Sequence, residues 1–190
     1  MPWLIKNRKL TNNICRILFV SFSLFFCSHV FSDTTEEFSI KAAFMIKMLP
    51  YIEWPAAEDN NKTHFTICIH HTPTHKKVLA DWSKNSLVRG KPVDIIHFEK
   101  KPTSVKPCDI LYASTNEKLS QYIEPANIKN MLTVSDVDGN AKRGFIINFV
   151  KINNRHRFEI NYEAAKNQGF VISPRLLKIA KIVSTEASKK

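Results

Sequence analysis

The stretch that decides the fold is Thr63-His-Phe-Thr-Ile-Cys-Ile69, in which polar and apolar side chains alternate as they do in a β-strand. Pro73 then opens a segment with helical spacing, and a second strand-like run follows at Pro92-Val-Asp-Ile-Ile-His-Phe98. A strand, a helix and another strand in this order predict a parallel α/β sheet.

The same alternation continues towards the C-terminus. We expect further strands over residues 109–113, 131–134, 145–150 and 157–161, and helices over 36–48, 117–123, 162–168 and 174–183. The last two strands are joined by Asn153-Asn154, a pair typical of a tight bend, so they should form an antiparallel hairpin. The predicted fold class is therefore α/β: a mostly parallel, Rossmann-like sheet with helices on both faces and a late antiparallel hairpin.

The first predicted helix is apolar on most of its faces. Such a helix is either wholly buried or gives one face to a partner, and the sequence leaves both roles open. Its apolar residues are Phe38, Ile40, Ala42, Ala43, Phe44, Met45, Ile46 and Met48.

The N-terminus has the features of an export signal. A basic segment that contains Lys6, Arg8, Lys9 and Arg16 precedes an apolar run over residues 17–27. That run is too short to span a bilayer, which takes about 20 apolar residues; an uncleaved anchor is the alternative. We predict a cleavable signal peptide over residues 1–32, cleaved near Ser32, and a single exported domain over residues 33–190 in an oxidising compartment.

The chain is moderately basic. The chain has 28 Lys and Arg against 17 Asp and Glu, with a net charge of +11, and four of the positive charges belong to the predicted signal. The remaining basic residues are dispersed, with no Arg-rich stripe, which argues against nucleic acid as a partner. An acidic protein face or an anionic membrane surface fits better, and an ordinary solvated surface is the simplest interpretation.

Two cysteines, Cys68 and Cys108, remain after the signal. An even pair in an oxidising compartment can form a disulfide, and two buried free thiols are the alternative. A metal site is less favoured, because two cysteines far apart in sequence do not make a ligand set.

Little in the sequence indicates catalysis. His70 and His71 follow the first strand at its carboxyl end, which is the usual ligand edge of an open α/β sheet. Zinc needs three or four converging ligands, so we predict no metal and no cofactor there. Trp54, Trp82 and Tyr51 could line an apolar pocket, although core packing is the default for aromatic residues. No nucleophile–base pair or glycine-rich phosphate loop is legible, and the chain is not predicted to be an enzyme.

The ordered motifs resemble the YfiR-like periplasmic regulatory proteins from about Glu36 to Ser184. The motifs that carry the resemblance are residues 40–55, 66–69, 108–112, 132–136, 144–149, 157–161 and 172–177. The resemblance implies an α/β regulator, often a homodimer, that binds the periplasmic sensing domain of an inner-membrane diguanylate cyclase and holds it inactive. By position, Cys68 and Cys108 match the bridging pair of that family.

Two hypotheses follow. The first is a binding module that represses a diguanylate cyclase or a related envelope sensor, with Phe44, Met48 and Trp54 as candidate contacts. The second is a small-molecule-binding sensor module whose ligand lies near His70 and His71.

Overall fold

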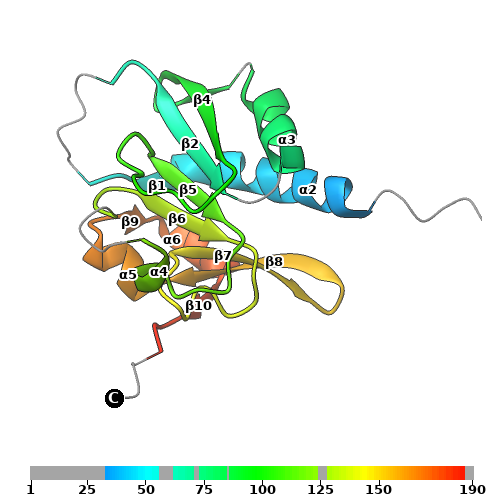
Figure 1. Cartoon of the computed structure of the whole chain (residues 1–190). Helices are drawn as coiled ribbons and strands as arrows, with labels where there is room; N and C mark the ends of the chain where they lie inside the picture. Colours follow the sequence, from blue (N-terminus) through cyan, green and yellow to red (C-terminus); the bar gives the residue numbers. More distant parts are fainter. Residues whose placement is uncertain (1–32, 56–61, 71–72, 85, 124–127, 187–190) are drawn as a thin grey trace, which may run out of the picture. The chain divides into compact units, whose positions relative to one another are not determined.

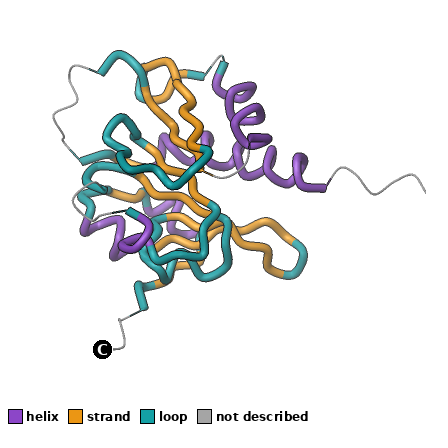
Figure 2. The backbone as a smooth tube through the Cα atoms, viewed as in Figure 1, coloured by secondary structure: helices purple, strands orange, loops and turns teal. Residues whose placement is uncertain are grey.

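A mostly parallel sheet dominates the compact unit Thr35–Lys190. The computed structural model describes residues 33–55, 62–70, 73–84, 86–123 and 128–186. Eight strands of this part form one sheet in the order β10-β8-β7-β6-β5-β2-β4-β3, and β1 pairs with β9 in a separate two-stranded sheet. The predicted α/β class, with a mostly parallel sheet flanked by helices, is confirmed (Figures 1 and 2).

The helices and strands follow one another along the chain as predicted for most of its length. The helical segments are α2 (Asp33–Met48), η2 (Leu49–Tyr51), α3 (Pro73–Ser83), α4 (Leu119–Tyr122), α5 (Tyr162–Asn167) and α6 (Pro174–Ile179). The strands are β1 (Ile52–Glu53), β2 (Phe65–His70), β3 (Leu87–Val88), β4 (Lys91–Phe98), β5 (Ile110–Ala113), β6 (Leu132–Ser135), β7 (Ile147–Ile152), β8 (Arg155–Asn161), β9 (Val171–Ile172) and β10 (Lys181–Val183).

The centre of the sheet is parallel and its late part is an antiparallel hairpin. Strand β2 lies between β4 and β5, and β5 continues to β6 and β7, all in parallel pairs. Strands β7 and β8 are antiparallel and are joined by Asn153 and Asn154, whose φ angles are 49° and 58°. Asparagine tolerates this left-handed region better than most residues, which explains its presence at the predicted bend.

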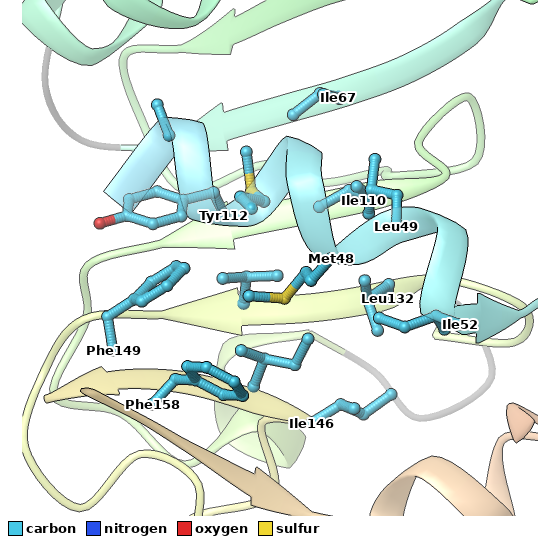
Figure 3. Close-up of a cluster of buried hydrophobic side chains, with 14 of the residues drawn as sticks. Met48, Leu49, Ile52, Ile67, Ile110, Tyr112, Leu132, Ile146, Phe149 and Phe158 are labelled. Carbon is cyan, nitrogen blue, oxygen red and sulfur yellow. The ribbon is translucent and has the colours of Figure 1, made fainter. Parts of the chain in front are cut away.

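Each face of the sheet has its own hydrophobic cluster. Because successive side chains of a strand point to opposite faces, Ile67 and Ile69 join the cluster beneath α2, whereas Cys68 joins the other. Figure 3 shows Met48 and Leu49 together with Ile110 and Leu132 of the sheet in the first cluster. All six residues of β2 are buried, as expected for a central strand with both faces covered.

The C-terminal segment differs from the prediction. We expected helix over residues 174–183, but α6 ends at Ile179 and Lys181–Val183 form β10, which pairs in parallel with β8. The β-branched residues Ile182 and Val183 suit a strand, and the free edge of β8 supplies the backbone partners. Residues 117–123 were also expected to be helical throughout, yet α4 is restricted to Leu119–Tyr122.

A short sheet that the sequence did not predict ties the two ends of the domain together. Ile52 of β1 pairs with Ile172 of β9, and both side chains are buried. Gly169 precedes β9 with a φ of +83°, and a Cβ at this position would lie 2.9 Å from Cβ of Pro55. Glycine therefore permits both the turn and the close approach of the Trp54-Pro55 segment.

Candidate functional site

A disulfide bonds Cys68 to Cys108 across the face of the sheet opposite α2. Cys68 lies in the middle of β2 and Cys108 lies just before β5; their Cα atoms are 5.6 Å apart, and the two cysteines are 40 positions apart in sequence. Both cysteines are buried in the second hydrophobic cluster. A bridge at this depth fixes β2 to the start of β5 and fits an oxidising compartment.

A carboxylate reinforces the same junction. The Asp109 Oδ2 atom accepts a hydrogen bond of 2.7 Å from the backbone N–H of Thr66, and its Oδ1 atom accepts one of 2.9 Å from Lys62 Nζ. The Asp109 backbone N–H donates to the Thr66 carbonyl. The amino-terminal end of this strand pair is thus held by covalent, ionic and backbone contacts together.

The carboxyl end of the parallel strands carries a half-buried polar cluster. Asp136 follows β6 and Ser114 follows β5, so the sheet brings them side by side. The Ser114 hydroxyl donates a 2.6 Å hydrogen bond to Asp136, and Lys41 Nζ of α2 lies 3.0 Å from the other carboxylate oxygen. Lys41 also pairs with Glu37 at 2.8 Å, one helical turn away.

These contacts control the ionisation of the cluster. Burial alone would raise the pKa of Asp136, but the Ser114 hydrogen bond and the Lys41 charge outweigh it, so the pKa is lowered. Burial likewise opposes the charge on Lys41, yet Glu37 and Asp136 raise its pKa overall. The hydrogen bond to Lys41 lowers the pKa of Glu37. All three groups stay charged at neutral pH and anchor α2 to the sheet.

His75 of α3 completes the cluster as a neutral ring. Its imidazole stacks on Phe38 with ring centroids 3.5 Å apart and meets Tyr112 edge-on at 5.7 Å. Burial lowers the pKa of His75 to about 4, and its Nδ1 atom has no hydrogen-bond partner among the described residues. Burial also raises the pKa of Tyr112 well above its ordinary value, as does the nearby Asp136 charge. In the described part of the chain, the Tyr112 hydroxyl has no hydrogen-bond partner of standard geometry.

At the predicted ligand edge, His70 and His75 lie against different hydrophobic clusters, on opposite faces of the sheet. His70 is 6% exposed, and its ring lies 5.4 Å from that of Tyr122, which belongs to the second cluster. His75 contacts Phe38 of the first cluster instead, and His71 lies outside the described residues. Within the described ranges, no group of three or more His, Cys, Asp or Glu side chains could hold a metal ion.

The outer face of α2 carries an apolar groove of about 280 Å³. Phe44 is 43% exposed, and Trp82 of α3, at 44%, forms one wall. We call this surface the outer face of α2. Its lining residues are Glu36, Ser39, Ile40, Ala43, Phe44, Lys47 and Trp82.

The structure separates the three candidate contact residues. Phe44 lies on the outer face of α2, whereas Met48 is 3% exposed and belongs to the core. Trp54 is half-buried, with its ring edge-on to Phe65 and Phe170. Of the three, Phe44 is therefore the one whose large apolar side chain is exposed to solvent.

Ile40 and Trp82 were not among the predicted partner contacts, although Trp82 was one of the three aromatic residues named as able to line an apolar pocket. Ile40, Ala43, Phe44 and Lys47 are spaced as one stripe of a helix, which is the signal that could have found this face. The stripe was hidden because α2 is apolar on its other faces as well. Trp82 comes from a different helix, so no local pattern links it to the groove.

The architecture is that of an α/β domain with a buried disulfide and an exposed apolar helix face. Within the described residues, no helix has the length and apolar character needed to cross a bilayer. The YfiR/HmsC-like family model matches residues 38–181, and the chain belongs to this family. Its members are periplasmic, regulatory and non-catalytic. No curated protein is similar enough in sequence to be matched to the chain.

Proposed function

We propose that this protein represses an inner-membrane signalling protein by binding its periplasmic sensing domain, and that the target is a diguanylate cyclase that makes cyclic di-GMP. The choice of target rests on the resemblance to YfiR-like regulators. The observation that carries a binding role is the outer face of α2, where Phe44 and Trp82 flank an apolar groove on the surface. Exposed aromatic side chains in such a setting are typical anchors of protein interfaces.

The mechanism is a shift of population. A regulator that binds the inactive conformation of a sensor stabilises that conformation by its differential affinity for the two states. Moving an equilibrium from 1:99 to 99:1 takes about 5.5 kcal/mol of such preference. The contacts of Phe44 and Trp82 contribute to this preference to the extent that they form with the inactive conformation and are lost with the active one.

The anchored inner side of α2 suits this role. The helix is held to the sheet by the ion pair of Lys41 with Asp136 and by buried residues such as Met45. A binding surface on a helix fixed in this way loses little conformational freedom on association. The polar cluster therefore supports binding indirectly, as a positioning device.

Cellular cyclic di-GMP, measured with and without the gene, tests the proposal. We expect deletion to raise cyclic di-GMP, because the target is released from repression, and the exported wild-type protein to restore the lower level. A chain lacking residues 1–32 and kept in the cytoplasm is the matched control and should not restore it. Unchanged cyclic di-GMP on deletion would exclude a diguanylate cyclase as the target.

The proposal also requires export. The predicted signal peptide, residues 1–32, lies outside the described residues, so cleavage near Ser32 stays a prediction. N-terminal sequencing of the protein from the periplasmic fraction should give a first residue of Asp33. A mature chain that begins at Met1 would mean an uncleaved anchor instead.

A further inference from the structure

The hairpin of β7 and β8 extends beyond the rest of the sheet. Strand β6 pairs with β7 as far as Asn148, and β10 pairs with β8 only from Glu159 onwards. Residues 149–158 therefore pair across the hairpin and form a two-stranded ribbon that projects from the sheet (Figures 1 and 2). The end of this ribbon, residues 150–157, contains three Lys or Arg and no Asp or Glu. We call residues 150–157 the cationic ribbon.

One face of the cationic ribbon is turned towards α2. Lys151 and His156 form a cross-strand pair on this face, and the Glu37 carboxylate of α2 interacts electrostatically with both. The positive charge of this face is thus partly compensated within the chain. The face turned towards α2 is therefore the less attractive one for an anionic partner.

The opposite face combines aliphatic side chains with guanidinium groups. Val150 lies opposite Arg157 and Ile152 lies opposite Arg155. Because side chains alternate between the two faces of a strand, these four point away from α2. Ile152 is 40% exposed and both arginines are exposed. Within the described residues neither arginine has an ion-pair partner, and Arg157 donates a long hydrogen bond of 3.5 Å to the His156 carbonyl.

We propose that this face of the cationic ribbon docks on the headgroup layer of an anionic phospholipid membrane. The guanidinium groups of Arg155 and Arg157 bind lipid phosphates, which match their planar, forked donors. The side chain of Ile152 enters the boundary between the headgroups and the acyl chains. The docking is peripheral and reversible, because a few basic residues and one aliphatic side chain do not insert a protein into a bilayer.

The two arginines of the cationic ribbon differ from arginines that serve the fold. Arg89 lies over the ring of Trp54 at 5.6 Å, and Arg143 donates a 2.9 Å hydrogen bond to the Asn140 side chain. These two guanidinium groups are occupied inside the domain, whereas those of the cationic ribbon extend into solvent. A charge that the fold does not use is available to an anionic surface.

The shape of the cationic ribbon favours a membrane over an acidic protein. Interfaces between proteins usually centre on large aromatic or Arg side chains enclosed by a pocket. Residues 150–157 include no Trp, Tyr or Phe, and they project from the sheet. A projecting two-stranded ribbon can enter a headgroup layer from its end, and the polar Asn153-Asn154 turn suits that hydrated layer. Exposed aliphatic side chains beside basic ones are typical of segments that lie in a membrane interface.

This docking rests on the cationic ribbon alone and does not depend on the proposed target. Combined with the proposed function, it holds the regulator on the membrane in which its target resides. The cationic ribbon and the outer face of α2 share no residue, so both can be used at once. Confinement to the membrane surface would raise the effective concentration of the regulator around the target.

Co-sedimentation with vesicles tests the docking, using the mature protein purified from the periplasmic fraction. We expect wild type to bind vesicles made of equal parts of phosphatidylglycerol and phosphatidylcholine at low ionic strength, to be released by high salt, and not to bind pure phosphatidylcholine. Each basic residue near an anionic surface strengthens binding about fivefold, so Arg155→Gln/Arg157→Gln should lower the partition coefficient about 25-fold.

Lys76→Gln/Lys77→Gln is the matched control, because it removes the same charge from the exposed surface of α3. It should stay within about twofold of wild type, since these charges lie away from the docking face. An Ile152→Cys variant labelled with an environment-sensitive fluorophore should brighten on anionic vesicles, because the label leaves water there. Circular dichroism of every variant checks that the fold is kept.

Three results would overturn the docking. Wild type that does not bind the anionic vesicles would point to an acidic protein as the partner of the cationic ribbon. Equal losses in the two double variants would mean that binding follows net charge alone, and a label at position 152 that stays in water would exclude contact through this face. Because only purified protein and lipid are present, its failure is separate from any failure of the cyclic di-GMP experiment.

Discussion

The two sides of α2 differ in almost every physical respect although they share one helix. The inner side buries Phe38, Met45 and Met48 against the sheet and fixes Lys41 by two ion pairs. The outer face leaves Phe44 43% exposed beside a groove and carries charges without ion-pair partners in the described chain. One side therefore supports the stability of the fold, and the other is free for association. Apolar residues in the sequence alone do not distinguish these two roles.

The largest expected contrast comes from shortening one side chain on each side of α2. Met48→Ala removes a core side chain and should cost about 2–5 kcal/mol of unfolding free energy, because the cavity cannot fully collapse. Phe44→Ala, the matched outer change, should cost roughly 1 kcal/mol or less, since the ring is already partly in water. Urea unfolding of residues 33–190 measures both, and equal losses would remove the distinction between the two sides.

The ion pairs of α2 give the next contrast. Lys41→Met leaves the Asp136 carboxylate without its cation in a mostly buried site, and we expect a loss of about 2–3 kcal/mol. Lys47→Met changes the same residue type on the outer face and should stay within roughly 0.5 kcal/mol of wild type. Both are measured by urea unfolding at neutral pH. A Lys41→Met protein as stable as wild type would show that the buried pair does not hold the helix.

A smaller effect concerns pH. The pKa of His75 falls from an ordinary 6.5 to about 4 in the folded protein, so the unfolded chain binds its proton first. The stability from the neutral ring is complete above pH 6.5 and is lost as pH falls from there to about 4. His75→Phe keeps an aromatic ring beside Phe38 but does not titrate.

Between pH 7.5 and pH 5, wild type should therefore lose about 1–2 kcal/mol more than His75→Phe, a range that allows for the partial exposure of the ring. Urea unfolding at the two pH values gives this difference directly. Identical losses for the two proteins would mean that His75 is solvated like an ordinary surface histidine.

The sequence predicted the fold class, the central strands and the cysteine pair, because those features depend on local alternation and on a count of two thiols. It missed β10 and the β1–β9 pair, since two- and three-residue strands carry almost no periodic signal and depend on a distant partner edge. It also missed the Asp136 cluster, whose members come from separate elements and meet only when the parallel strands align. Helical spacing did not separate Met48 inside from Phe44 outside, because α2 is apolar on most of its faces.

The measurement that tests the central claim most directly is cyclic di-GMP in a deletion strain that produces the exported Phe44→Asp protein. We expect this variant to reach the periplasm at wild-type amount with an unchanged circular dichroism spectrum, yet to leave cyclic di-GMP as high as in the deletion strain, because the outer face of α2 can no longer bind. Full repression by a folded Phe44→Asp protein would contradict the account.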